Sequence, residues 1–229
     1  MKTISKILRY RGLATIVISF SIFFILPQWL HSQEESSKVD TPWQLKIEKE
    51  GVQLYSRWMP ATPQMKTRQL RGVFFVEASP EEVLQLIQFE SSVESWINRS
   101  KVAYTFNKNQ EGNQWFSYTQ FALPWPISDQ DLVLENNMQV SIKERLIHIQ
   151  MYSVEGVMDS QKGVKRIQQF EGSWQLKGLP SGKTQVEYKV QTKNKSSFPT
   201  WITDPVVQQN LLHTLSNLRS AAEKFHLTK

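Results

Sequence analysis

The sequence predicts an α+β fold, in which an antiparallel β-sheet of about seven strands is covered on one face by a long C-terminal helix. Between residues 101 and 191 the regular stretches alternate apolar and polar residues with the two-residue period of strands. The connections there are polar, contain glycine and are too short for a crossover helix, so neighbouring strands should be joined as hairpins. After residue 204 the period becomes that of an amphipathic helix, which leaves one helix to cover the sheet.

The N-terminus has the pattern of an export signal. Lys2, Lys6, Arg9 and Arg11 precede an uncharged apolar run over residues 13–26. A helix of 14 residues spans about 21 Å, which is less than the roughly 30 Å hydrocarbon core of a bilayer. The length therefore favours a signal peptide over a permanent membrane span.

The signal predicts three segments: a signal peptide over residues 1–32, a polar tether over residues 33–41 and a folded domain over residues 42–229. If the signal is cleaved after Ser32, the protein is exported to the periplasm or secreted. If it is not cleaved, the N-terminal helix anchors the domain to the membrane.

Composition excludes several classes of function. The chain has no cysteine, so it forms no disulfides and has no thiol chemistry or thiolate metal site. Removal of residues 1–32 takes four positive charges from a net charge of +6 and leaves +2. A nucleic-acid partner is therefore not expected, because such binding needs a basic face on the folded domain. Nothing indicates a coiled coil or an obligate dimer, so we expect a monomer.

The first part of the domain should contain two strands and two helices. Trp43–Lys49 can form a short helix, although its apolar positions Trp43, Leu45 and Ile47 fit the helix and strand periods equally, and Gly51 then releases the chain into a strand at Val52–Tyr55. Leu70–Val76 is a second strand. Ser79-Pro80-Glu81-Glu82 then predicts a helix start, because Ser79 can cap, proline suits the first helical position and Glu82 can complete a capping box.

Six further strands and the final helix complete the prediction. The strands are expected at Val102–Phe106, Trp115–Leu123, Asp131–Gln139, Arg145–Tyr152, Lys165–Leu176 and Thr184–Thr192. Their alternation implies that one face of the sheet is covered and the other is wet. The helix is expected to begin with Asp204 as its N-cap and Pro205 at its first position. Its apolar stripe comprises Val207, Leu211, Leu215, Leu218, Ala222 and Phe225.

Two elbows of proline and aromatic residues are the most specific local sequences: Pro124-Trp125-Pro126 and Phe198-Pro199-Thr200-Trp201. Neither contains a nucleophile, a metal-ligand cluster or a phosphate-binding glycine loop, and the motifs of serine hydrolases, zinc proteases and dinucleotide-binding enzymes do not occur. Asp129-Gln130-Asp131 has the spacing of some metal-dependent glycosyltransferases, but without a nucleotide-binding fold a role in the turn is favoured. No cofactor or metal is expected.

The order of several short motifs resembles the START (StAR-related lipid transfer) domains, especially their bacterial members. The resemblance covers most of residues 43–226. Its carriers are Glu50-Gly51-Val52-Gln53-Leu54-Tyr55, the Ser79-Pro80-Glu81-Glu82-Val83 helix start, Trp96, Pro124-Trp125-Pro126, Gly172-Ser173-Trp174-Gln175-Leu176, Thr184-Gln185-Val186-Glu187-Tyr188, Phe198-Pro199-Thr200-Trp201 and the helix segment 210–219. The family commonly has Arg-Asp after the proline elbow, whereas this chain has Gln130-Asp131, which puts in doubt any ion pair that the arginine makes.

The resemblance implies a helix-grip fold that binds one lipid or other hydrophobic molecule in a cavity between the sheet and the C-terminal helix, which acts as a lid. The candidate ligand-binding residues are Trp96, Trp125, Trp174, Trp201, Leu211, Leu215 and Leu218; the tryptophans are equally explained as core residues. The candidate membrane-docking residues are Lys193, Lys195, Phe198 and Trp201, which combine cations with aromatic side chains; an exposed turn is the alternative.

Two rival functions remain open at the level of sequence. The same fold occurs in polyketide cyclases and aromatases, although export and the scarcity of histidine argue against an enzyme. The chain could also be an envelope interaction protein with a closed pocket, which would require a sizeable exposed apolar patch elsewhere. We favour an exported, non-enzymatic lipid carrier that makes transient contact with membranes.

Overall fold

A computed structural model describes residues 41–62, 65–88, 96–125, 127–192 and 200–228. The expected signal peptide, the tether up to residue 40 and three docking candidates, Lys193, Lys195 and Phe198, lie outside the described residues. In the part of the chain that the structure describes, no helix is both long enough and apolar enough to cross a membrane.

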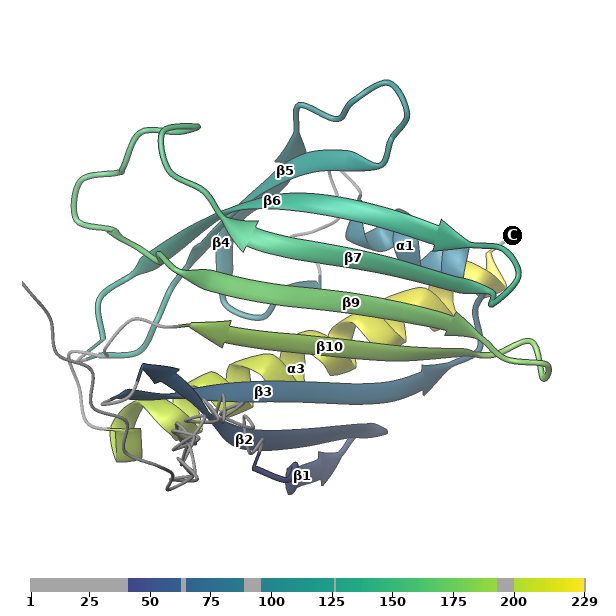
Figure 1. Cartoon of the computed structure of the whole chain (residues 1–229), viewed down its shortest axis with the longest axis horizontal. Coiled ribbons are helices and arrows are strands. Elements are labelled where there is room, and N and C mark those ends of the chain that lie inside the picture. The colour runs from purple at the N-terminus through teal and green to yellow at the C-terminus, as the bar shows by residue number, and fades with distance from the viewer. Residues whose placement is uncertain (1–40, 63–64, 89–95, 126, 193–199, 229) are drawn as a thin grey trace, which may run out of the picture. The chain divides into compact units, whose positions relative to one another are not determined.

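A single ten-stranded sheet forms most of the described chain (Figure 1). Its strands are β1 (Gln44–Lys49), β2 (Val52–Thr62), β3 (Met65–Val76), β4 (Ser100–Phe106), β5 (Gln114–Phe121), β6 (Gln130–Ser141), β7 (Leu146–Ser153), β8 (Lys165–Arg166), β9 (Phe170–Gly178) and β10 (Thr184–Thr192). The order across the sheet is β1-β2-β3-β10-β9-β7-β6-β5-β4, and β8 pairs with β6. The curved antiparallel sheet is as predicted, but it has more strands than the expected seven.

The structure corrects the start of the domain. The stretch read as a short helix is strand β1, which pairs antiparallel with β2. Glu50 and Gly51 link the two strands, and both have positive φ angles of 55° and 74°. Two consecutive residues with positive φ form the turn whose twist matches a hairpin, so the turn selects a strand for the six residues before it.

The strand predicted over Lys165–Leu176 is also divided. Its first two residues form β8, which runs parallel to β6, while β9 begins only at Phe170. Gln169, just before β9, has a φ of 53°, a conformation that interrupts an extended strand. The described chain is therefore not purely antiparallel.

Helix α1 (Pro80–Ile87) begins as the sequence predicted. The Glu82 backbone N–H donates to the Ser79 hydroxyl over 3.2 Å, and the Ser79 backbone N–H donates to the Glu82 carboxylate over 2.8 Å. This reciprocal pair is a capping box, which satisfies two backbone donors at the N-terminus of the helix.

Helix α3 (Thr200–Leu227) lies across one face of the sheet and packs against β2, β3 and α1 (Figure 1). The prediction that Asp204 caps this helix is wrong, because α3 begins at Thr200 and includes Pro205. The Asp204 carboxylate forms an ion pair with Arg68 of β3 instead. The predicted apolar stripe is buried from Leu211 to Ala222, whereas Val207 is exposed.

We call the face of the sheet that is turned toward α3 the inner face. Gly72 of β3 identifies it, since a Cβ atom there would point at Leu215 of α3. By the alternation of strand residues, Val186, Trp174 and Ile149 share this face with Gly72. The core of the domain lies between the inner face, α1 and α3, and it is formed largely by aliphatic and aromatic side chains.

Candidate functional site

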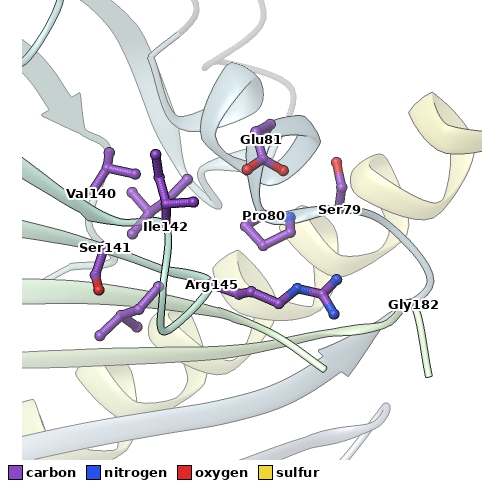
Figure 2. A pocket seen from close by; sticks show the side chains of 10 residues that line it. Ser79, Pro80, Glu81, Val140, Ser141, Ile142, Arg145 and Gly182 are labelled. Carbon is purple, nitrogen blue, oxygen red and sulfur yellow. The ribbon is translucent and has the colours of Figure 1, made fainter. Parts of the chain in front are cut away.

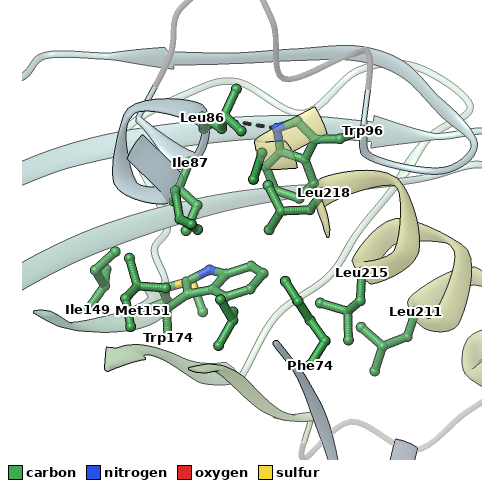
Figure 3. Packing of buried hydrophobic residues seen from close by; sticks show 14 of the residues in the cluster. Phe74, Leu86, Ile87, Trp96, Ile149, Met151, Trp174, Leu211, Leu215 and Leu218 are labelled. Atoms are coloured by element: carbon green, nitrogen blue, oxygen red, sulfur yellow. Dashed lines mark hydrogen bonds between the residues drawn. The ribbon is translucent and has the colours of Figure 1, made fainter. Parts of the chain in front are cut away.

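Two tryptophans occupy the centre of the interior (Figure 3). Trp174 of β9 and Trp96, which precedes β4, are both buried, and their rings meet edge to face with centroids 6.3 Å apart. The indole N–H of Trp96 donates to the Leu86 carbonyl over 3.2 Å. Trp174 also packs on the Tyr188 ring, with centroids 4.0 Å apart. The structure therefore brings together two of the four predicted tryptophans.

Leu211, Leu215 and Leu218 of α3 are buried and lie on the side of the helix that faces these aromatic rings (Figure 3). A Cβ atom on Gly72 would lie 2.1 Å from Leu215 Cδ1, which is far inside van der Waals contact. Only glycine at this position lets α3 approach β3 so closely. The helix is thus fixed to the β2–β3 side of the sheet, and large side chains fill the space toward β7 and β9.

The remaining predicted site residues do not join this group. The Trp125 side chain is 92% exposed, at the elbow between β5 and β6. Trp201 lies in α3, but its side chain is outside the described residues, as are Lys193, Lys195 and Phe198. The roles proposed for these residues stay predictions.

The inner face also carries polar side chains that sequence reasoning missed. Asn136 of β6 is only 3% exposed and lies between Trp115 of β5 and Met151 of β7. Ser117 and Thr119 of β5 are half-buried on the same face. One signal was available: in β6 the inward positions read Leu132, Leu134, Asn136 and Met138, so a polar residue interrupts an apolar stripe.

Tyr188 of β10 adds a hydroxyl to the inner face. Burial raises the pKa of its phenol well above the ordinary value, so the group is neutral and can donate a hydrogen bond. On the described inner-face positions of β5, β6, β7, β9 and β10 there is no carboxylate, amine, guanidinium or imidazole. This part of the interior is therefore apolar with a few uncharged polar groups.

The outer face has a separate buried group. The Arg166 guanidinium of β8 donates twice to Asp131 of β6, from Nε to Oδ1 over 2.7 Å and from Nη2 to Oδ2 over 3.0 Å. The Tyr118 hydroxyl donates to the same carboxylate over 3.4 Å, and Arg166 also donates to the backbone carbonyls of Met158 and Asp159. Asp131 thus has a buried ion pair, but its arginine comes from β8 rather than from position 130.

Burial, together with the neighbouring Asp131 charge, raises the pKa of Tyr118. The hydrogen bonds from Arg166 to Asp131 raise the pKa of that guanidinium. Both groups keep their protons, and the hydrogen bonds from Arg166 to Asp131 fasten the β7–β9 connection onto the outer face.

Two hollows lie outside the interior. One, of about 220 Å³, is formed by the start of α1 and the β6–β7 hairpin, including Pro80, Val140 and Arg145 (Figure 2). The other, of about 190 Å³, lies on the outer face around His148 and Lys189. Both are smaller than the roughly 300 Å³ at which pockets for drug-sized ligands begin. Among the described residues, no group of three or more metal-ligating side chains occurs.

This combination defines a class: a helix-grip domain whose apolar interior lies between a curved sheet and its C-terminal helix. No protein family model matches the chain. It is 27% identical to an uncharacterized protein of Pseudomonas aeruginosa, over 80% of this chain and 87% of that protein.

Solved structures share the fold. A STAR-related lipid transfer protein fragment from Xanthomonas axonopodis matches 80% of this chain and 99% of its own, with a TM-score of 0.69 and 22% identity. Human StAR-related lipid transfer protein 5 matches 80% of this chain and 88% of its own, with a TM-score of 0.66 and 18% identity. The chain has the START fold, as the sequence motifs indicated.

Proposed function

We propose that this protein binds one lipid molecule between the inner face and α3 and carries it between membranes. The observation that supports the proposal is the composition of the interior: Trp96, Trp174 and the α3 leucines are buried there, and the described inner-face positions of β5, β6, β7, β9 and β10 carry no charged side chain. Such surroundings suit an acyl chain or a fused-ring hydrocarbon. The two solved relatives are named as lipid transfer proteins, and we extend that function to this chain as a proposal.

Such a carrier solves a specific energetic problem. Moving a sixteen-carbon chain from a bilayer into water costs on the order of 13 kcal/mol at about 0.8 kcal/mol per methylene, so unaided desorption is very slow. A protein interior that excludes water removes most of this penalty. The protein then needs only to open next to a membrane and close around the lipid.

We propose that Trp125 makes the membrane contact. Its indole is exposed, and Asp129, four residues further along the chain, pairs with the exposed Lys101 ammonium. Tryptophan favours the headgroup region, where its ring is half in apolar and half in polar surroundings. Trp125→Ala should reduce co-sedimentation with anionic vesicles without changing thermal stability. Unchanged co-sedimentation would leave residues 193–201 as the docking candidates.

We propose that the protein is not an enzyme. A cyclase or aromatase would need a proton donor and acceptor beside the bound molecule. The acid–base pair Glu82–His226 lies where α1 meets the end of α3, and Glu82 already serves the capping box. The central described strands of the inner face offer only neutral hydroxyl and amide groups.

We also propose that the protein is exported and processed. The support is the charge and apolar pattern of residues 1–32. Mass spectrometry of the natively expressed protein should find a mature form that begins after Ser32. A form that begins at Met1 or Lys2 would contradict processing and favour an anchored protein.

Native mass spectrometry of the natively purified protein, followed by organic extraction, tests lipid binding itself. We expect a discrete added mass that is released by solvent and corresponds to one lipid. A ligand-free mass, together with no uptake from vesicles of mixed lipids, would contradict the proposal.

A further inference from the structure

The Asn136 amide is oriented by its surroundings. Its Nδ2 lies 3.2 Å from the Trp115 carbonyl, 3.4 Å from the Leu134 carbonyl and 3.1 Å from the Ser117 hydroxyl. Two of these three partners are carbonyl oxygens, which can only accept hydrogen bonds. The nitrogen must therefore face them, and the Oδ1 atom points the other way.

That Oδ1 atom accepts no hydrogen bond from any residue that the structure describes. The Ser117 hydroxyl accepts from Asn136, but its own proton has no acceptor among the described residues. Buried acceptors without a donor are rare in folded proteins, and each one calls for an explanation. The unused acceptor, Asn136 Oδ1, is on β6, and the unused donor, the Ser117 hydroxyl, is on the adjacent strand β5. The two side chains contact each other through the hydrogen bond from Asn136 Nδ2 to Ser117.

The inner-face hydroxyl on β4 behaves differently. Thr105, which is paired with Ser117 in the β4–β5 register, donates its proton to the Gln88 carbonyl over 3.0 Å. Its hydrogen-bonding capacity serves the fold. Thr119, two residues further along β5, and the Tyr188 hydroxyl of β10 also have no side-chain hydrogen bond to a described residue, whereas Ser117 and Asn136 are hydrogen-bonded to each other.

We propose that Asn136 and Ser117 form a polar subsite that binds the hydroxyl group of a neutral lipid. The lipid O–H donates to Asn136 Oδ1, and the lipid oxygen accepts from the Ser117 hydroxyl. This inference rests on the proposed lipid-binding function and specifies the ligand class: lipids whose polar end is an uncharged alcohol. An ether or an ester lacks the proton that Asn136 requires.

The surroundings of the subsite exclude charged headgroups. A carboxylate or phosphate beside Asn136 would be buried without a counter-ion, because the described inner-face positions of β5, β6, β7, β9 and β10 carry no cation. The inner-face side chains next to the subsite are apolar and suit the hydrocarbon part of the lipid. Met151 of β7 is the cross-strand neighbour of Asn136, and Ile149 on the same strand is the neighbour of Trp174.

Three probes of equal chain length test the inference. The full-length protein is incubated with phosphatidylcholine vesicles that contain 1-hexadecanol, its methyl ether or palmitate, and the bound lipid is quantified by native mass spectrometry and extraction. The wild-type protein should prefer the alcohol over the ether by about tenfold, since the ether leaves Oδ1 unpaired. Palmitate should bind less well than the alcohol.

Single-residue variants show which side chains cause the preference for the alcohol over the ether. Asn136→Leu should bind alcohol and ether within about twofold of each other, and Ser117→Ala, a smaller change, should lower the preference to about threefold. Thr105→Val removes a hydroxyl from the same face, one that already donates to the Gln88 carbonyl, and should keep the full preference.

The outcomes are separable. Uptake of all three lipids with no preference for the alcohol, or a preference that Asn136→Leu and Ser117→Ala both retain, would overturn the polar subsite while leaving the carrier function intact. A preference for palmitate over the alcohol would overturn the neutral class. No uptake of any probe would overturn the carrier function and the subsite with it.

Discussion

Asp131 and Asn136 lie five residues apart on β6, on opposite faces of the sheet, and both are buried. Asp131 has a full set of partners, which Arg166 and Tyr118 supply from the same chain. Asn136 keeps one oxygen without a donor among the described residues. The outer face is thus completed by the protein itself, whereas the inner face leaves hydrogen-bonding capacity for another molecule.

The largest effect should come from breaking the outer-face ion pair. Asp131→Ala leaves the Arg166 guanidinium buried without its carboxylate, and such a loss destabilises proteins by about 3–5 kcal/mol. Denaturant unfolding followed by circular dichroism measures this change. Lys101→Met, which breaks the exposed Lys101–Asp129 pair nearby, is the control and should change stability little. Equal effects of the two variants would show that the buried pair is not a major contribution.

The next largest effect concerns the contact that fixes α3 to the sheet. Gly72→Ala places a methyl group where Leu215 Cδ1 lies, and overpacking of this kind costs about 1–3 kcal/mol. The double variant Gly72→Ala/Leu215→Ala should recover part of the loss relative to the sum of the two single variants. Additive losses in the thermal unfolding of the three variants would argue against the close approach.

Asn136→Leu should be milder than Asp131→Ala for stability. The variant loses the Nδ2 hydrogen bonds but gains buried apolar surface, so we expect a change of no more than about 1.5 kcal/mol. Its effect on the alcohol preference should be large. Asp131 should therefore matter mainly for stability, and Asn136 mainly for the choice of ligand. A loss of stability as large as that of Asp131→Ala would assign Asn136 to the fold.

The smallest effect should appear in acid. The backbone N–H of Ser79 lowers the pKa of Glu82, with a further contribution from His226. A depressed pKa in the folded state means that the stabilisation is complete above the unfolded value of about 4.3 and is lost as the pH falls through the folded pKa. Glu82→Gln should therefore flatten the decline in stability below about pH 4.5, as measured by urea unfolding from pH 7 to pH 3. A decline as steep as that of the wild-type protein would contradict this assignment.

Much of the architecture followed from local patterns. The start of α1 was predicted from Ser79, Pro80 and Glu82 alone. The alternation along β10 predicted which of its residues lie on the inner face. The error at β1 arose because six residues with mixed periods do not distinguish a helix from a strand, and the Glu50-Gly51 turn decided the outcome. Arg166 could not be foreseen as the partner of Asp131, since a two-residue parallel strand brings it across 35 positions.

The candidate site was predictable only in part. Trp96 and Trp174 are bulky enough to be expected in any interior, and the structure places both there. Trp125 looks equally apolar in the sequence, yet the elbow turns it into solvent, which depends on the geometry of the connection. Asn136 was missed because its significance depends on Oδ1, which has no donor among the described residues. The sequence does not show this, since the partners of the amide are known only once β5 and β6 are paired.

Photo-crosslinking locates the bound lipid most directly. The full-length protein is loaded with a hexadecanol analogue that carries a diazirine in mid-chain, irradiated, digested and analysed by mass spectrometry. We expect labels on inner-face residues and on the buried side of α3, with Met151, Trp174 and Leu215 among the candidates. Labels concentrated on the outer face, around His148 and Lys189, would contradict it.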